Sequence, residues 1–342
     1  MSIEEFVPKT QQAIEGVGFL FGAGASYEAG YPLVAGLTRQ VIGELNTSER
    51  DQLDEILGTF NLKYDDENCT PNIEEIADHV IEYFTNSASE TSKNLRERLR
   101  ELVREAIISV QNPDITHHVR FLEGLRRRSF SRATRINIIT TNYDLLFEQA
   151  ASEVGIRLIN GFSGSIFRFF SEKEFSLSFG DLAASRFRPD ASLTVNLIKL
   201  HGSVSWFSVS DTIRELDPYR IETNATRCMV LPRRTKVIET LHRPYDRLFA
   251  VCTHILGGSC RYLVSSGFSY SDQHINDTLI VPKVEGAGIN LTNFCGSEPF
   301  CLSSVRERPN VTHICSDKKV IGGDEVRAES DLWKFSEFAK LF

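Results

Sequence analysis

The sequence has no pair of cysteines with the close spacing that zinc sites and redox motifs use. None of its cysteines are spaced Cys-x-x-Cys, and a structural zinc site usually contains at least one such short pair. Their odd number also argues against a disulfide framework. We therefore predict no metal site, and free thiols that pack as small apolar side chains. The cysteines are Cys69, Cys228, Cys252, Cys260, Cys295, Cys301 and Cys315.

Long apolar runs and an excess of positive charge are also missing. No run of about 18 apolar residues occurs, so no membrane span is expected. The first residues include Glu4 and Glu5 and lack the apolar stretch of a signal peptide. The net charge of −8 argues against broad nucleic-acid binding, which depends on clustered Lys and Arg. We expect a cytoplasmic protein that binds neither membranes nor, directly, nucleic acids.

Apolar residues make up 41 % of the 342 residues, and 23 are Phe, which is enough for a large core. Short apolar strands alternate with segments of helical period, the latter at about 34–45 and 144–154. This alternation predicts an α/β fold, a Rossmann-like and mostly parallel sheet with helices on both faces. The predicted strands are 18–21, 135–140, 195–200, 261–265 and, with a weaker pattern, 311–315.

A mostly helical insertion is predicted at about 47–130. Four segments there place apolar residues at helical spacing, and Asn72 is a candidate N-cap for one of them. Residues 160–191 lack a clear period and are expected to form an irregular connection or an active-site flap. We expect residues 1–342 to form a single catalytic domain. Within residues 322–342, Trp333 and Phe335 indicate a packed helix.

Four short segments follow predicted strands, at the edge where an open α/β sheet binds its ligands. In the first, Gly22 to Ser26, two glycines let the backbone approach a phosphate, and N–H groups at the next helix N-terminus can hold it. A tight turn without a ligand is the alternative. A full dehydrogenase fingerprint would need Gly or Ala at Tyr27.

The other three segments carry polar side chains suited to chemistry. Asn142 and Asp144 follow the second strand, and their alternative roles are a turn residue and a helix N-cap. His201 ends another strand and can take up a proton near neutral pH, although a lone His is more often structural. Residues 265–276 are rich in hydroxyl groups suited to ribose and phosphate, with Asp272 as a candidate N-cap.

Taken in this order, the four segments resemble the sirtuin-like superfamily. Gly22–Ser26 is similar to its first NAD-binding loop, and Thr140–Asp144 to its Thr-Gln-Asn-x-Asp motif, with Thr141 in place of Gln. Leu200–Gly202 matches the segment with the catalytic His, and Gly267–Ser269 resembles the Gly-Thr-Ser segment. The paired zinc cysteines of the family's deacylases are missing. The sequence resembles instead the zinc-free bacterial branch that destroys NAD in anti-phage defence.

The resemblance implies an NAD+ hydrolase that cleaves the nicotinamide–ribose bond, giving nicotinamide and ADP-ribose. Asn142 would position water or a ribose hydroxyl, His201 would act as general base, and Asp144 would bind the carboxamide. NAD would be the substrate and no metal would take part. The residues expected to bind the rest of NAD are Gly22, Ala23, Gly24, Ser26, Thr141, Gly267 and Ser269.

The resemblance also implies a gated effector. We expect a homo-oligomer with a separate regulatory partner, such as an ATPase or a nucleotide-sensing protein encoded nearby. Two alternatives stay open, a module that senses NAD or ADP-ribose without cleaving it, and a zinc-free deacylase or ADP-ribosyltransferase. The sequence does not separate hydrolysis from cyclisation.

Overall fold

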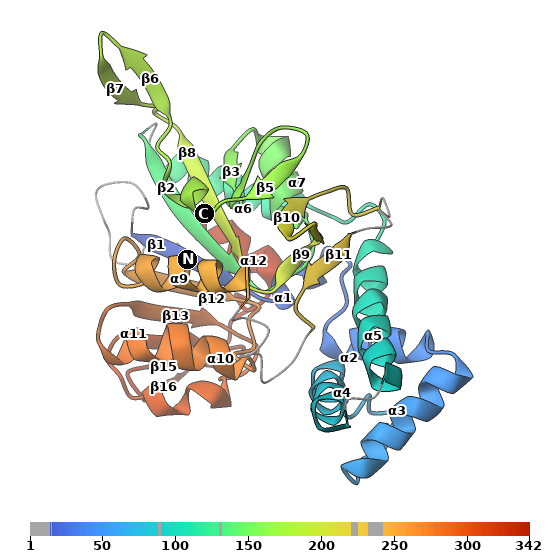
Figure 1. The fold of residues 1–342 in the computed structure, drawn as a ribbon. Coiled ribbons are helices and arrows are strands. Elements are labelled where there is room, and N and C mark those ends of the chain that lie inside the picture. Colours follow the sequence, from blue (N-terminus) through green and yellow to red (C-terminus); the bar gives the residue numbers. More distant parts are fainter. Residues whose placement is uncertain (1–13, 15, 88–89, 130–131, 220–224, 232–241) are drawn as a thin grey trace.

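The computed structural model describes residues 14, 16–87, 90–129, 132–219, 225–231 and 242–342 (Figure 1). The first thirteen residues, on which the expectation about a signal peptide rests, lie outside the described residues. The described part contains a nine-stranded sheet, a five-stranded sheet and a two-stranded hairpin. No helix in this part of the chain is long and apolar enough to cross a membrane.

The large sheet has the strand order β16-β15-β14-β13-β12-β1-β2-β8-β3. The strands from β14 to β3 pair in parallel, and β15 and β16 add an antiparallel edge. The expected α/β fold with a mostly parallel sheet is therefore confirmed. The parallel strands are β1 (Val17–Phe21), β2 (Thr134–Thr140), β3 (Arg157–Ile159), β8 (Leu193–Lys199), β12 (Tyr262–Ser266), β13 (Asn290–Phe294) and β14 (Val311–Ile314).

Both faces of this sheet are covered, so its central strands are buried on both sides. All residues of β1 and β8 are buried. Phe19 and Phe21 point to one face, where they pack with α6 (Thr116–Arg128), α7 (Leu146–Val154) and α12 (Phe335–Phe338). Leu20 points to the other face, toward α9 (Tyr245–Ile255), α10 (Gln273–Ile275) and α11 (Val281–Glu285).

Much of the phenylalanine lies in the first of these two cores. Phe21 contacts the rings of Phe121, Phe147 and Phe335 at centroid distances of 5.1–5.5 Å. Phe338 also packs against Phe21, at 5.9 Å. The C-terminal helical segment therefore covers the sheet directly beneath the end of β1.

The helices α2 (Val34–Gly43), α3 (Thr47–Thr59), α4 (Ile73–Ser87) and α5 (Glu90–Ile108) form a helical body. Its core also includes Tyr143, Leu146 and Val204, so it packs against the segments that follow β2 and β8. It extends away from the sheet (Figure 1). Asn72 accepts from the N–H groups of Glu74 and Glu75 at the start of α4, as its predicted capping role requires. The last predicted helix, α6, packs on the sheet and not in this body.

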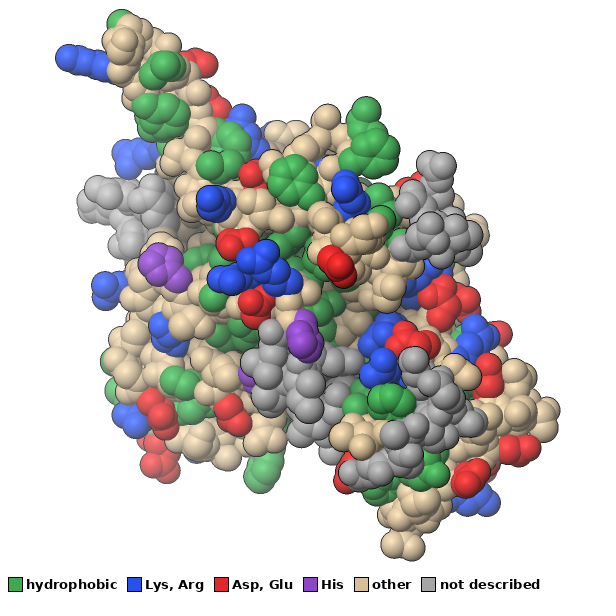
Figure 2. All heavy atoms as spheres, viewed as in Figure 1, with side chains coloured by type: hydrophobic (Ala, Val, Ile, Leu, Met, Phe, Trp, Pro, Cys, Tyr) green, Lys and Arg blue, Asp and Glu red, His purple; other side chains and the backbone are tan. Residues whose placement is uncertain are grey.

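The region 160–191 contains regular structure that the sequence pattern does not reveal. β4 (Phe162–Ser163) and β5 (Arg168–Phe170) join β9 (Gly202–Val209), β10 (Thr212–Glu215) and β11 (Thr226–Met229) in the five-stranded sheet. β6 (Gly180–Ala183) and β7 (Arg186–Pro189) form a hairpin that projects from the molecule (Figure 1). Hydrophobic side chains are exposed on this projecting hairpin (Figure 2). Leu182 of β6 is 76 % exposed and Phe187 of β7 is 49 % exposed.

The C-terminal residues divide between two structures. Gly322 and Gly323 form the turn between β15 (Lys318–Ile321) and β16 (Asp324–Arg327). Phe335 and Phe338 of α12 are buried in the sheet core, whereas Trp333 is 39 % exposed.

Candidate functional site

The four sequence segments follow a single row of residues across the parallel sheet. Phe21, the last residue of β1, pairs with Thr140 of β2 on one side and with Ser266 of β12 on the other. Thr140 in turn pairs with Lys199, the last residue of β8. Because the four strands end at the same level, the segments that follow them start side by side. β1 lies between β2 and β12. After β1 the chain adds β2 and β8 on one side of it, and later adds β12 on the other side. Ligands bind at such a switch in strand order in this class of fold.

The glycine loops after β1 and β12 pack directly against each other. The N–H of Gly24 donates to the carbonyl of Gly267 over 2.9 Å. A Cβ on Gly24 would lie 2.6 Å from the Cα of Gly267, and Gly267 has a φ of +64°. Both positions therefore need glycine for this backbone contact, whatever ligand the loops hold.

The first loop uses several of its own donors. The N–H groups of Ala25 and Ser26 donate to the carbonyls of Gly22 and Ala23. The helix that follows, α1 (Gly24–Tyr27), has only four residues. In this conformation three of the loop's N–H groups are therefore engaged within the protein, and no long helix begins there.

Ser26, Asn142 and Asp144 form a compact polar cluster at the ends of β1 and β2. The Ser26 hydroxyl donates to Asp144 Oδ2 over 2.7 Å, and the Asn142 amide donates to Ser26 Oγ over 2.8 Å. The same amide reaches the carbonyl of Gly22 over 2.9 Å. Asp144 is buried, and its Oδ1 accepts from the N–H of Leu146 over 3.1 Å. The N-cap residue of α7 is Leu145 and not Asp144, so the alternative role of Asp144 as a helix N-cap is wrong.

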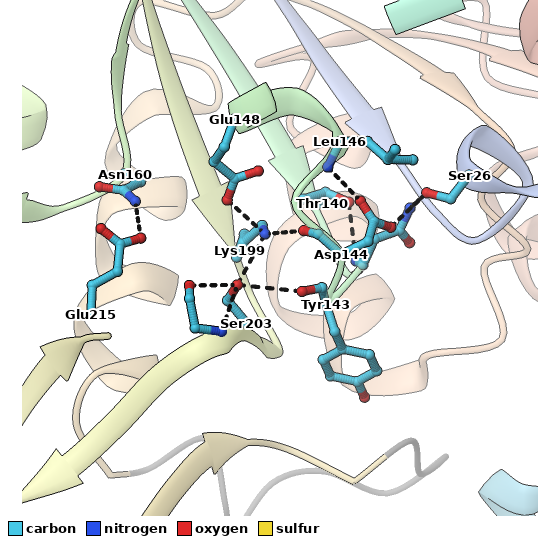
Figure 3. A network of polar contacts seen from close by, with 12 residues as sticks. Ser26, Thr140, Tyr143, Asp144, Leu146, Glu148, Asn160, Lys199, Ser203 and Glu215 are labelled. Atoms are coloured by element: carbon cyan, nitrogen blue, oxygen red, sulfur yellow. Dashed lines mark hydrogen bonds and ion pairs between the residues drawn. The ribbon is translucent and has the colours of Figure 1, made fainter. Parts of the chain in front are cut away.

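A buried lysine connects this cluster to the segment after β8 (Figure 3). Lys199 is only 1 % exposed and forms an ion pair of 2.7 Å with Glu148 of α7. Its ammonium group also donates to the carbonyl of Asp144 and to Ser203 Oγ. Burial raises the pKa of Glu148, and the Lys199 charge opposes that rise. One ammonium group thus holds both segments that carry the candidate catalytic residues.

His201 lies on the sharp turn between β8 and β9. Gly202 has a φ of +84°, and a Cβ there would lie 2.2 Å from the carbonyl of Cys228, so only glycine fits after the histidine. The buried ring of His201 has its Nε2 2.9 Å from Oδ2 of Asp272, and its centroid lies 6.4 Å from that of Tyr143. Tyr143 stands between Asn142 and Asp144 in the chain, which places His201 beside their loop.

The remaining predicted binding residues lie around this edge. Ala23 and Ser269 are exposed, and Gly24, Thr141 and Gly267 are half-buried. Gly22 is buried under Phe268, whose Cα would lie 2.8 Å from a Cβ on that glycine. The structure therefore brings all ten predicted site residues to one end of the sheet.

Sequence patterns did not single out Lys199, Glu148 or the second role of Asp272. His118 of α6 was also not singled out by the sequence, and it is buried against the rings of Phe147 and Phe335. Neither of its ring nitrogens has a hydrogen-bond partner among the described residues. Burial lowers the pKa of His118 to about 4, so the ring is neutral at pH 7.

Comparison with known proteins bears on the second half of this site. Residues 136–281 match the family model of the SIR2-like domain. This segment is similar to the SIR2-like domain. It contains Asn142, Asp144, His201 and Asp272, but it covers less than half of the chain and leaves out the loop 22–26. No curated protein matches the chain.

Among solved structures, the chain is similar to one described as the structure of Sir2Tm bound to a propionylated peptide. The two are 13 % identical, with a TM-score of 0.43 over 99 % of this chain and 96 % of that chain. Within the described residues there is no group of three or more His, Cys, Asp or Glu side chains placed to hold a metal ion. The seven cysteines are free.

Proposed function

We propose that this chain is an NAD+ hydrolase that cleaves the nicotinamide–ribose bond and releases nicotinamide and ADP-ribose. The observation that carries the proposal is the convergence of Asn142, Asp144 and His201 beside two packed glycine loops. These three residues lie within the SIR2-like segment. Their chemistry is an amide, a carboxylate and an imidazole, which suits a neutral leaving group and an attacking water.

The side chains fit the nicotinamide end of the substrate. A carboxylate has about four lone-pair positions, so Asp144 can accept from a carboxamide N–H beside its bonds to Ser26 and Leu146. Asn142 is half-buried, and its NH2 group donates to Ser26 and Gly22, which leaves its Oδ1 to accept from water or a ribose hydroxyl. His201 accepts the proton that the nucleophile releases. Because nicotinamide leaves as a neutral molecule, orientation supplies much of the rate.

The fit at the phosphate end is different from that of a dehydrogenase. Gly24, Ala25 and Ser26 use their N–H groups inside the loops. The exposed hydroxyl of Ser269 and the exposed residue Ala23 therefore supply more of the contacts to the phosphates of NAD. Thr141, Gly22 and Gly267 complete the surface around them. We assign the pyrophosphate and ribose to this edge.

An enzyme that consumes NAD would harm its own cell unless it were restrained. We therefore place this chain in the cytoplasm as a gated effector of anti-phage defence. It would act as a homo-oligomer under the control of a separate protein, either an ATPase or a nucleotide sensor encoded nearby.

The test is NAD consumption by the purified chain, alone and with the products of neighbouring genes, with the products identified. Asn142→Ala and His201→Ala should each lower the rate by about a hundredfold or more, as expected for positioned catalytic groups. His254→Ala is the matched control, because His254 lies exposed on α9. The control should cleave NAD at the wild-type rate.

The products separate the alternatives. Nicotinamide with ADP-ribose supports hydrolysis, and a cyclic product would replace hydrolysis by cyclisation. NAD loss only in the presence of an acylated peptide or an acceptor would point to a deacylase or transferase. Binding of NAD without turnover under every condition would refute the proposal and leave a sensor.

A further inference from the structure

The pairing of His201 with Asp272 joins two loops that lie far apart in the sequence. His201 Nε2 and Asp272 Oδ2 are 2.9 Å apart, and the residues are separated by 71 positions. The side chains are 5 % and 7 % exposed. Since water has little access to either group, this contact determines the direction of the imidazole ring more strongly than a surface contact would.

The Asp272 carboxylate is fixed by a second bond. Its Oδ1 accepts from the N–H of Ile275 over 3.2 Å, as the N-cap of α10. Its backbone carbonyl also accepts from the N–H of Asn276 over 3.1 Å. The Asn276 side chain in turn donates to the carbonyl of Tyr270 over 2.7 Å. One carboxylate oxygen is therefore held by the helix, and the other is directed at His201.

The role of a helix cap explains only Oδ1, because any capping residue could supply that oxygen. A carboxylate accepts hydrogen bonds and donates none, so the contact through Oδ2 requires a proton on His201 Nε2. In the neutral ring Nδ1 is then the nitrogen that takes up a proton. The carboxylate also stabilises the imidazolium that forms when it does so.

We propose that Asp272 is the positioning residue of His201, which sets the ring's tautomer and orientation for its role as general base. This inference rests on the proposed cleavage of NAD, and it adds a fourth residue to Asn142, Asp144 and His201. Asp272 does not touch the reacting atoms and acts only through the histidine.

The decisive variant is Asp272→Asn, which has the same shape and reverses the donor pattern. The N–H of Ile275 needs an acceptor, so the Asn oxygen stays on the cap and its NH2 group faces His201. Nε2 must then accept, and the ring proton moves to Nδ1. Asp272→Ser is the second variant, because serine also caps helices but does not extend to the imidazole.

The matched control is Asp114→Asn, the same chemical change at another helix start. Asp114 Oδ1 accepts from the N–H of Thr116 over 2.9 Å near the start of α6, and the residue is exposed. α6 packs on the face of the sheet opposite α10, so this variant tests the loss of a carboxylate bonded to a helix-start N–H without altering the His201 pair.

We would record the 15N imidazole spectrum of each protein, assign His201 by its loss in His201→Asn, and measure kcat and KM for NAD. Asp272→Asn should move the His201 proton to Nδ1 and lower kcat by about a hundredfold or more, with KM changed by less than about threefold. Asp272→Ser should lower kcat similarly. Asp114→Asn should change neither the protonated nitrogen of His201 nor kcat.

A His201 ring that keeps its proton on Nε2 in Asp272→Asn, or a kcat within about threefold of wild type, would overturn the inference. A rise in kcat would overturn it too, because it would mean that Asp272 restrains His201. If the wild-type protein cleaves no NAD, either alone or with the products of the neighbouring genes, the proposed function fails. The spectra still decide whether Asp272 sets the tautomer, so the two failures are distinguishable.

Discussion

Replacing Lys199 with methionine should destabilise the protein by about 3–5 kcal/mol, the cost of leaving the buried carboxylate of Glu148 without its partner. At 2.7 Å and an effective dielectric constant of 20, the attraction between the two charges is about 6 kcal/mol. Removing both ions from water costs several kcal/mol each, so the pair as a whole contributes little net stability. The double variant Lys199→Met with Glu148→Met should therefore recover to within about 1.5 kcal/mol of wild type.

The assay is urea unfolding of the wild type, both single variants and the double variant, combined as a double-mutant cycle. The exposed pair Lys340–Glu337 is the matched control, and its cycle should give less than about 1 kcal/mol. A Lys199→Met cost below about 1 kcal/mol, or additive effects at positions 148 and 199, would refute the reasoning.

The rate of NAD cleavage by the same variants is a second measurement. The double variant lacks the ammonium group that donates to the Asp144 carbonyl and to Ser203. Its NAD cleavage should therefore stay at least about tenfold below wild type even where its stability is recovered, since misplaced catalytic groups lose rate steeply. Full recovery of both stability and activity would mean that the pair is structural only.

Three further predictions concern single residues. Gly267→Ala should destabilise the fold by more than about 1 kcal/mol in urea unfolding, because its Cβ would lie 2.4 Å from the Ala25 nitrogen at a positive φ, whereas Gly43→Ala, with open space around it, should not. Ser26→Ala should reduce kcat/KM for NAD about tenfold, because its hydroxyl bridges Asn142 and Asp144, and an unchanged kcat/KM would contradict that role. His118 has a folded pKa of about 4, below its unfolded value, so the unfolded state binds the extra proton and stability falls as the pH drops from about 6.5 toward 4. Between pH 7 and pH 5 this amounts to about 2 kcal/mol, and His118→Leu should lose that share of the pH dependence of urea unfolding.

The parallel sheet and the helices on its faces could be predicted because buried strands and amphipathic helices leave periodic patterns in the sequence. β1, β2, β8 and β12 lie within a few residues of their predicted ranges. β13 lacked such a signal, since its only two apolar residues, Leu291 and Phe294, are three positions apart and form neither an apolar run nor an alternating pattern. The short strands β4 and β5 have two and three residues, too few for a pattern to stand out.

The parts of the candidate site that depend on residue type at strand ends could be predicted from the sequence. The side-chain contacts between distant segments could not. Asn142, Asp144 and His201 follow strand ends, and parallel strands bring such positions together. Lys199 is a residue type expected at the surface, and its burial depends on Glu148 from a helix elsewhere in the chain. Asp272 could be identified as an N-cap from its neighbours, whereas its contact with His201 depends on the pairing of β1 with β12.

The row of strand ends at Phe21, Thr140, Lys199 and Ser266 has a consequence for synthesis of the protein. β12 is made long after β1, yet it must lie beside β1 before Gly267 can meet Gly24 and before Asp272 can reach His201. A chain growing on the ribosome, or one cut short before β12, therefore contains Asn142 and His201 without a completed site. Under the proposed function, unfinished copies would not consume the host's NAD.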